Sequence, residues 1–235
     1  MAIRFAFALL ASGVVTAAPC FSAELEEGFV PLFDGESIDG WVQRGGKAVY
    51  TVENGEIVGT SVANTPNSFL CTPRNYADFV LLVELKVDSG LNSGIQIRSE
   101  CFDKAFVAKA ELPGGKAFRR RIPAGRVHGY QVEIDPSERS YSGGIYDEAR
   151  RGWLYDLRGD ANQAAREAFR RDDWNEYRIE AVGDSLRTWV NGVPAAELTD
   201  GMTSTGFIAL QVHGIRSKDQ VGKQVRWRNL RIQEK

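Results

Sequence analysis

The chain has 235 residues, of which 43% are hydrophobic and 26% are charged. These proportions are ordinary for globular proteins and exclude a disordered, collagen-like or coiled-coil chain. The 29 Lys and Arg residues nearly balance the 31 Asp and Glu residues, so the net charge is −2. This balance provides no basic patch of the kind that binds nucleic acid or an anionic membrane.

The N-terminal segment has the order of a secretory signal peptide: a charge, an apolar run, then small residues. Arg4 is its only charged residue, and the apolar run covers residues 5–15, too few to span a bilayer as a helix. We predict that residues 1–23 direct export and that cleavage falls between Ala18 and Glu24. The mature protein is then periplasmic or secreted. No later stretch of the sequence is apolar for the roughly 18 residues that a membrane helix needs.

Three cysteines fit the same picture. Cys20 lies in the segment expected to be removed, and Pro19 before it argues against lipid attachment. Cys71 and Cys101 remain, and in an exported protein they form either a disulfide or two separate buried thiols. Two cysteines alone are too few for a closed structural zinc site.

The rest of the chain predicts β-strands joined by tight turns. Asn-Gly pairs at 54–55 and 191–192 and Gly-Asp at 183–184 are typical of two-residue hairpin turns. Only residues 160–171 predict a helix, with Asp160 as N-cap and basic residues in its last turn. The strands are expected at 49–53, 56–59, 79–87, 93–98, 129–135, 143–146, 176–182, 186–191, 206–213 and 225–233.

Ten short strands with one helix predict an all-β domain over 29–235, built as a β-sandwich or jelly roll. No repeat or linker interrupts this range. The Gly143-Gly144 pair predicts a turn or bulge. The basic runs at 119–121 and 150–151 are interpreted as solvated charge in loops.

Three of the predicted strands alternate between apolar residues and large polar residues. Side chains alternate between the faces of a strand, so each of these strands has one apolar and one polar face. A sheet with one solvated face would alternate in the same way. However, the polar positions hold amides, carboxylates, an arginine and an imidazole, which favours a face that binds sugar hydroxyls. These residues are Gln96, Arg98, Gln131, Glu133, Asp135, Gln211 and His213.

The order of several segments resembles the 3-keto-disaccharide hydrolase domain family. They include PLFDGESIDGW at 31–41, LNSGIQIRS at 91–99, GYQVEID at 129–135 and GFIALQVHG at 206–214. In many members the glutamate and glutamine of GYQVEID are exchanged relative to Gln131 and Glu133. The other segments that carry the resemblance are 75–87, 143–157, 174–194 and 225–232.

The resemblance implies a concanavalin A-like jelly roll of two antiparallel sheets, one of them concave. It also implies cleavage of glycosides that carry a ketone at C3. Such a ketone acidifies the C2 proton, so a base can remove it, the group at C1 is eliminated, and water adds back. This chemistry needs a general base, an acid for the leaving oxygen and a donor for the enolate oxygen.

These needs assign expected roles on the polar face. Glu133 and His213 are the candidate proton-transfer pair, and Arg98 is the candidate stabiliser of the enolate. Substrate hydroxyls are expected to bind Gln96, Gln131, Asp135, Tyr146 and Gln211. No cofactor is predicted, although Glu133, Asp135 and His213 could share a divalent metal. The alternative function is a non-catalytic carbohydrate-binding, lectin-like module, since the same fold serves both.

Overall fold

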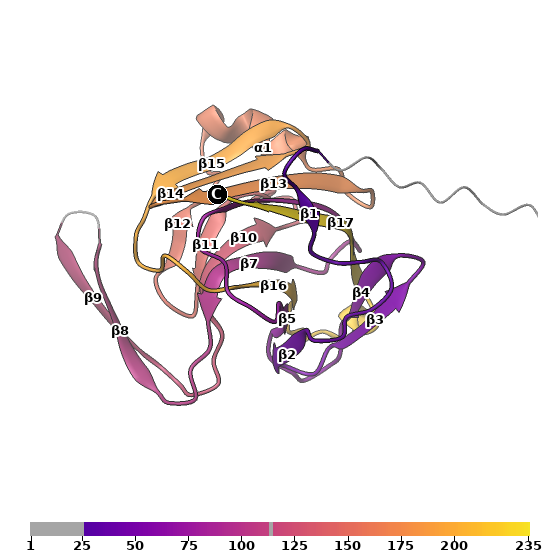
Figure 1. The fold of residues 1–235 in the computed structure, drawn as a ribbon, viewed down its shortest axis with the longest axis horizontal. Coiled ribbons are helices and arrows are strands. Elements are labelled where there is room, and N and C mark those ends of the chain that lie inside the picture. Colours follow the sequence, from indigo (N-terminus) through magenta and orange to yellow (C-terminus); the bar gives the residue numbers. More distant parts are fainter. Residues whose placement is uncertain (1–25, 113–114) are drawn as a thin grey trace, which may run out of the picture.

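The computed structural model describes residues 26–112 and 115–235, which form two antiparallel β-sheets packed face to face (Figure 1). The signal peptide predicted at 1–23, and Cys20 with it, lies outside these residues. One sheet, here the outer sheet, has the strand order β15-β14-β13-β6-β17-β4-β3, with β1 paired to β17. The other, here the groove sheet, has the order β12-β11-β10-β7-β16-β5-β2. This arrangement confirms the predicted all-β jelly-roll class.

The outer sheet consists of β1 (Val30–Pro31), β3 (Val49–Glu53), β4 (Glu56–Thr60), β6 (Phe79–Val87), β13 (Asn175–Val182), β14 (Ser185–Val190), β15 (Val193–Thr199) and β17 (Gln224–Glu234). The groove sheet consists of β2 (Val42–Gly45), β5 (Ser68–Cys71), β7 (Ser93–Glu100), β10 (His128–Ile134), β11 (Ile145–Glu148), β12 (Gly152–Tyr155) and β16 (Phe207–Val212). Strands that are distant in sequence pair side by side, as β7 does with β10 and β16.

A single large hydrophobic cluster fills the space between the sheets. It takes the inward-facing residues of both, among them Leu81 and Leu85 from β6, Ile95 from β7 and Val132 from β10. Trp227 of β17 is fully buried there. Because alternate residues of each strand enter this cluster, the residues between them on the groove sheet face away from the core wherever the alternation is unbroken.

The one α-helix is shorter than predicted. A 3-10 turn, η1 (Asp160–Asn162), leads into α1 (Gln163–Ala168), and Phe169 has extended backbone angles that end the helix. Asp160 is not the N-cap: Gly159 precedes the 3-10 turn, and no side chain caps it.

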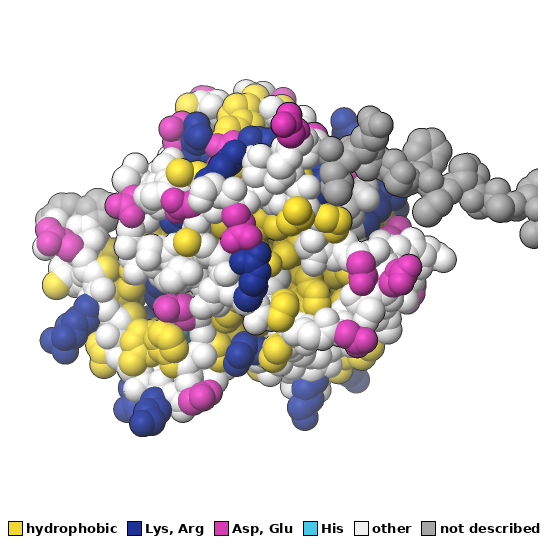
Figure 2. Space-filling model, in the orientation of Figure 1, with side chains coloured by type: hydrophobic (Ala, Val, Ile, Leu, Met, Phe, Trp, Pro, Cys, Tyr) yellow, Lys and Arg dark blue, Asp and Glu magenta, His cyan; other side chains and the backbone are white. Residues whose placement is uncertain are grey.

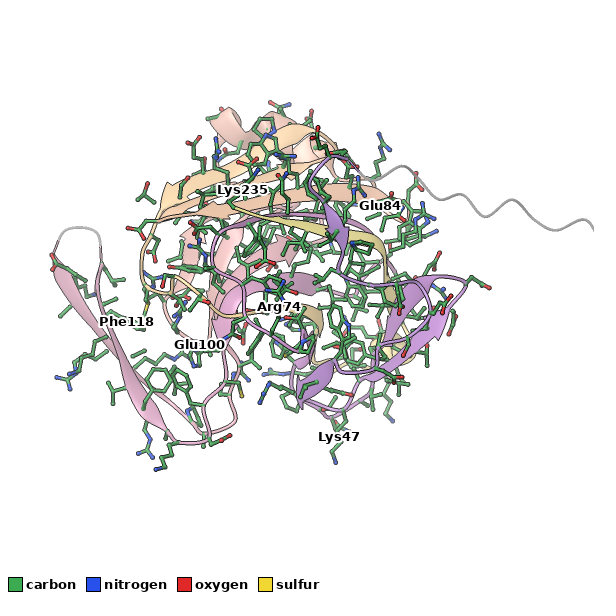
Figure 3. The ribbon with its side chains drawn as sticks, in the orientation of Figure 1. Lys47, Arg74, Glu84, Glu100, Phe118 and Lys235 are labelled. Carbon is green, nitrogen blue, oxygen red and sulfur yellow. The ribbon has the colours of Figure 1, made fainter. Side chains whose placement is uncertain are left out.

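A separate hairpin, β8 (Phe106–Leu112) with β9 (Lys116–Ile122), extends away from both sheets (Figure 1). Figure 3 shows Phe118 out on this hairpin, whereas Glu100 lies where β7 leads towards it. The basic run at 119–121 was expected in a loop but belongs to β9.

The second basic run is not solvated charge, contrary to the prediction. Arg150 and Arg151 follow β11, and the Nε atoms of both contact the buried Asp147 carboxylate, at 2.7 and 2.6 Å. Arg151 also bonds Asp200 at 2.7 Å. The two guanidinium groups are buried because they neutralise a buried carboxylate.

The two cysteines of the described residues are not joined. Cys71 and Cys101 are free thiols that pack in the same small apolar cluster, so the disulfide alternative is not realised. No helix within 26–112 or 115–235 is long and apolar enough to cross a membrane. Figure 2 shows acidic and basic side chains interspersed over the visible face, in keeping with the balanced charge.

Candidate active site

A groove of about 540 Å³ lies over the polar face of the groove sheet. A second hollow of about 510 Å³ continues it and shares Asn67, Asn92, Arg126 and His213 with it. Strands β10, β11, β12 and β16 and the turns beside β5, β7 and β10 supply its lining. The groove is lined by Asn67, Asn92, Arg126, Gln131, Glu133, Asp135, Ser137, Arg139, Tyr146, Glu148, Trp153, Gln211 and His213.

Most of the site residues expected from the sequence meet in this groove. Strand alternation accounts for this, because Gln131 and Glu133 of β10 share a face with Gln211 of β16. Gln96 lies beneath the groove and bonds Gln131 without lining it. Those that line it are Gln131, Glu133, Asp135, Tyr146, Gln211 and His213.

The polar face is buried, which distinguishes it from an ordinary solvated sheet face. Gln131, Glu133 and Asp135 are 3%, 5% and 3% exposed, and Gln211 is fully buried. Burying amides and carboxylates is costly unless they bond one another or a ligand. The polar groups of this face therefore need partners within the protein or a ligand in the groove.

Glu133 is the most perturbed carboxylate of the groove. Asn92 Nδ2 donates to its Oε1 at 2.8 Å, and Gln131 Nε2 donates to its Oε2 at 2.9 Å. Burial raises the pKa of Glu133 to about 7, although these hydrogen bonds and the charge of Arg139 act in the opposite direction. A carboxylate that titrates near neutrality is suited to general acid–base catalysis.

Asp135 stays ionised beside it. Burial opposes ionisation, but hydrogen bonds from Ser137, Arg139 and Tyr141 outweigh it and hold the pKa of Asp135 below its usual range. Arg139 Nε donates to Asp135 Oδ2 at 2.8 Å, and its Nη2 lies 3.3 Å from Glu133 Oε1. One guanidinium therefore bridges both carboxylates at the rim of the groove.

His213 follows the end of β16 and its ring is exposed in the groove. Its Nδ1 lies 2.8 Å from the carbonyl oxygen of Gly214, which can only accept, so Nδ1 carries the proton and Nε2 has a lone pair when the ring is neutral. The groove walls exclude enough water to lower the pKa of His213, against the hydrogen bond to Gly214. A neutral imidazole with Nε2 available is the state favoured at pH 7.

Aromatic rings form one wall of the groove. The Trp153 ring lies edge-on to Tyr146 at 5.3 Å and to Tyr141 at 5.4 Å between centroids. The Arg139 guanidinium lies 4.9 Å from the Tyr141 ring and 5.3 Å from the Trp153 ring. Rings beside hydrogen-bonding groups suit a sugar, which has both apolar C–H faces and hydroxyls.

Arg98 does not lie in the groove, contrary to the prediction. It has a positive φ of 43°, and the pairing of β7 with β16 shifts register between Phe207 and Ala209. Such a bulge interrupts the alternation of faces. The guanidinium instead donates to Ala77 O at 2.7 Å, to Gly183 O at 2.6 Å and to Asp78 Oδ1 at 2.8 Å. Arg98 is a buried link between the sheets.

The part of the groove sheet beyond the groove is covered. Val127, with Cys101 beside it, packs on Phe69, Phe207 and Ala209, which share the outward face of β5 and β16. The segment between β7 and β10 therefore fills this part of the face with apolar contacts. It leaves the polar part open.

Glu133, Asp135 and His213 do not form the metal site considered from the sequence. Among residues 26–112 and 115–235, no three His, Cys, Asp or Glu side chains are grouped so that they could hold a metal ion. The Arg139 guanidinium already occupies the position between the two carboxylates.

Several groove residues were missed by the sequence analysis because they lie outside the alternating strands. Arg139 comes from the turn after β10, and Asn92 comes from the turn before β7. A signal for Arg139 existed in its spacing, four residues after Asp135, which allows an ion pair across a turn. The other groove residues missed are Asn67, Arg126, Ser137, Glu148 and Trp153.

The two sheets form a jelly roll of the kind found in carbohydrate-related proteins, and the groove on one sheet holds a buried polar site. Residues 28–233 match the family described as the 3-keto-alpha-glucoside-1,2-lyase-like domain. The chain belongs to this family. No curated protein matches the sequence.

Solved structures share the fold at low sequence identity. A candidate glycosyl hydrolase from Parabacteroides distasonis is 17% identical with a TM-score of 0.54, and the match covers 89% of this chain and 94% of that one. A galectin-like protein of unknown function from Bacillus subtilis is 12% identical with a TM-score of 0.56, over 88% and 94%. The carbohydrate-binding module CBM66 of Bacillus subtilis is 14% identical with a TM-score of 0.52, over 82% and 94%.

Proposed function

We propose that this protein cleaves the glycosidic bond of sugars that carry a ketone at C3. The observation that carries the proposal is a buried carboxylate, Glu133, whose pKa lies at about 7 in a polar groove. Membership of the 3-keto-alpha-glucoside-1,2-lyase-like domain family supports the substrate class. The proton to be removed is on C2, next to the ketone, and its removal needs a base of this strength held beside it.

The proposed reaction begins with Glu133. Its carboxylate removes the C2 proton, and the electrons of that bond form the enolate. The enolate then forms a C1–C2 double bond and expels the oxygen at C1, which takes the proton that Glu133 carries. Water adds to C1 while His213 Nε2 accepts its proton, and that proton returns to C2. The sum is hydrolysis, with both side chains restored.

Arg139 replaces Arg98 as the proposed stabiliser of the enolate. It is a permanent cation with a planar set of donors, and it lies at the groove rim beside the base. Its Nη1 has no partner among the residues of the described chain, so it can donate to the ketone oxygen at C3. Stabilising a charge that develops in the transition state is the largest contribution in many enzymes.

The remaining groove residues are proposed to hold the sugar. Asp135 and Gln211 Oε1 offer acceptors for hydroxyls, the second N–H of the Gln131 amide offers a donor, and Tyr146 and Trp153 offer ring surfaces. These contacts orient C2 against Glu133. Correct orientation alone contributes a large part of enzymatic rate enhancement.

The second candidate function is a non-catalytic carbohydrate-binding module, which the aromatic wall and the amides of the groove would also suit. Turnover decides between the two. Purified protein is incubated with a 3-keto glucoside and, separately, with its unoxidised parent, and release of the aglycone is followed. The proposal expects release from the ketone alone. Binding of both sugars without any release identifies a binding module instead.

The pH dependence of the rate tests whether Glu133 is the base. We expect kcat/KM for the ketone to rise through about pH 7 as Glu133 ionises, and Glu133→Gln to lose at least a hundredfold in rate. Deuterium at C2 is expected to slow turnover or to exchange with solvent. Full activity of Glu133→Gln would rule out this assignment of the base.

We also propose that the protein acts outside the cytoplasm, on the ground of the leader sequence at 1–23. N-terminal sequencing of protein from its native cells is expected to find a start between Ala18 and Glu24. Native protein that begins at Met1 would contradict this.

A further inference from the structure

Three buried glutamines on adjacent strands lie under the groove. Gln96 of β7 and Gln211 of β16 are fully buried, and Gln131 of β10 is 3% exposed. Gln96 does not line the groove and so has no access to a substrate. A buried amide costs free energy unless it is bonded, so the arrangement of these three side chains calls for a physical account.

The hydrogen bonds among the glutamines run in one direction. Gln131 Oε1 accepts from Gln96 Nε2 at 2.6 Å and from Gln211 Nε2 at 2.7 Å, which uses both lone pairs of this oxygen. The amide nitrogen of Gln131 is left to donate to Glu133 Oε2 at 2.9 Å. Reversing the Gln131 amide would place its nitrogen against two donors and its oxygen against the carboxylate.

The oxygen of the Gln96 amide is also bonded. Ser99 Oγ donates to Gln96 Oε1 at 2.8 Å, while the Gln96 amide nitrogen donates to Gln131. A chain of donors therefore leads from Ser99 through Gln96 and Gln131 to Glu133. Hydrogen bonds in such a chain polarise one another and are strongest when every member is paired.

Gly94 of β7 makes the room that the chain needs. A Cβ atom at Gly94 would lie 2.5 Å from Cδ and 2.6 Å from Cγ of Gln131, closer than any side chain tolerates. The Gln131 side chain therefore lies directly over Gly94. A methyl group there would displace Gln131 without removing any polar group.

We propose that Gln96, acting through Gln131, is a positioning residue that keeps a hydrogen-bond donor on Glu133 and so maintains this side chain as a carboxylate able to accept a proton. The inference rests on the proposed function in taking Glu133 as the base. Its physical basis is that donors to a carboxylate favour the charged form. The titratable and charged groups around Glu133 are Asp135, Arg139, Tyr146, Tyr177 and His213, with Arg126 and Glu148 in the same groove.

The chain is tested by titrating Glu133 directly. Full-length mature protein is labelled with carbon-13 at the Glu carboxyl groups, and the resonance of Glu133 is assigned by its absence in Glu133→Gln. Two variants disturb the chain: Gln96→Met removes the donor with little change in shape, and Gly94→Ala displaces Gln131. Ile95→Val is the matched control, because Ile95 is an equally buried β7 residue that faces the core.

We expect the Glu133 titration midpoint to rise by about one pH unit in Gln96→Met and in Gly94→Ala, and to stay unchanged in Ile95→Val. The rising part of the pH–rate profile shifts to higher pH together with the titration midpoint. Activity that is lost at pH 7 is therefore regained at higher pH. A merely structural role would lower the rate at every pH and leave the midpoint in place.

Two results overturn the inference: a midpoint unchanged in both chain variants, or an equal shift in Ile95→Val. The titration requires no turnover. A wild type inactive on every 3-keto glycoside would therefore refute the proposed function while leaving the measurement on Gln96 intact. Conversely, an active wild type with an unmoved midpoint refutes only the role of Gln96.

Discussion

Arg139 joins the two carboxylates of the groove to its aromatic wall. Its guanidinium bonds Asp135, approaches Glu133 and lies against the Tyr141 and Trp153 rings. The aromatic contacts restrict its position, and the carboxylates keep its charge close to the base. A cation held this way also stabilises Glu133 in its ionised form.

Replacing Arg139 should therefore have two effects. Arg139→Gln is expected to lower kcat/KM on a 3-keto glycoside by about a hundredfold, because the enolate loses its cation. It should also shift the rising part of the pH–rate profile, which reports the ionisation of Glu133, to higher pH, because a positive charge near the carboxylate is lost. Steady-state kinetics from pH 5 to 9, with Arg139→Lys as the charge-preserving control, measures both effects. Unchanged kinetics in Arg139→Gln would remove Arg139 from the mechanism.

The carboxylate proposed as the base could be located from the sequence, but the cation beside it could not. Glu133, Asp135 and Gln211 follow from strict alternation within strands, which fixes the face that each side chain occupies. Arg139 comes from a turn, where spacing does not fix direction. The predicted position of Arg98 was wrong for a different reason. Arg98 is on a strand, but a bulge breaks the alternation of that strand, and no pattern in the sequence indicates the bulge.

At the level of elements, the bulge in β7 redirects one arginine to join the two sheets. Arg98 reaches Ala77, Asp78 and Gly183, which belong to segments flanking β6 and β13 of the outer sheet. Its side chain is fully buried, while that of Asp78 is 40% exposed. The interaction therefore contributes to the stability of the sandwich and not to the groove.

Arg98→Met should destabilise the fold by about 2–4 kcal/mol, since two carbonyl bonds and a partly buried ion pair are lost. Urea unfolding measures this loss. Arg74→Met is the matched control, because the Arg74–Glu234 pair is about half exposed on both sides and should contribute at most about 1 kcal/mol. An Arg98→Met protein as stable as the control but inactive would return Arg98 to the active site.

The strands that the sequence predicts are those with alternation or a clear turn. The Asn-Gly turns at 54–55 and 191–192 have the positive φ values that such hairpins need, and β3, β4 and β14 beside them begin and end within two residues of the prediction. β15, which follows the second turn, was not predicted. β5 was missed because all four of its residues are buried and none alternates. β8 and β9 were missed because their many Ala, Lys and Arg residues disfavour strands.

For the whole molecule, the perturbed Glu133 links folding to pH. Its pKa is about 7 in the folded protein against 4.5 for an ordinary glutamate. The folded state therefore binds the proton more tightly than the unfolded state. Stability from this group is complete below pH 4.5 and is lost as the pH rises through about 7. Folding lowers the pKa values of Asp135 and Asp200 from 3.8. The stability that these two carboxylates contribute is therefore present at higher pH and is lost only as the pH falls below 3.8.

We expect the free energy of unfolding of the wild type to fall between pH 4.5 and 8 by on the order of 3 kcal/mol more than that of Glu133→Gln. Urea titrations of both proteins across this range give the difference. Parallel stability profiles would show that Glu133 titrates alike in the folded and unfolded chain.

The hairpin of β8 and β9 has a practical consequence, because its strands pair only with each other. An isolated two-stranded hairpin is marginally stable and opens without unfolding the rest of a protein. Its exposed Lys109, Lys116 and Arg119 should therefore be the first sites that trypsin cuts. Mass spectrometry of a brief digest is expected to show cleavage there, with both fragments still associated and the thermal unfolding of the sandwich retained. Early cuts within the two large sheets would show that the β8–β9 hairpin is more stable than its pairing indicates.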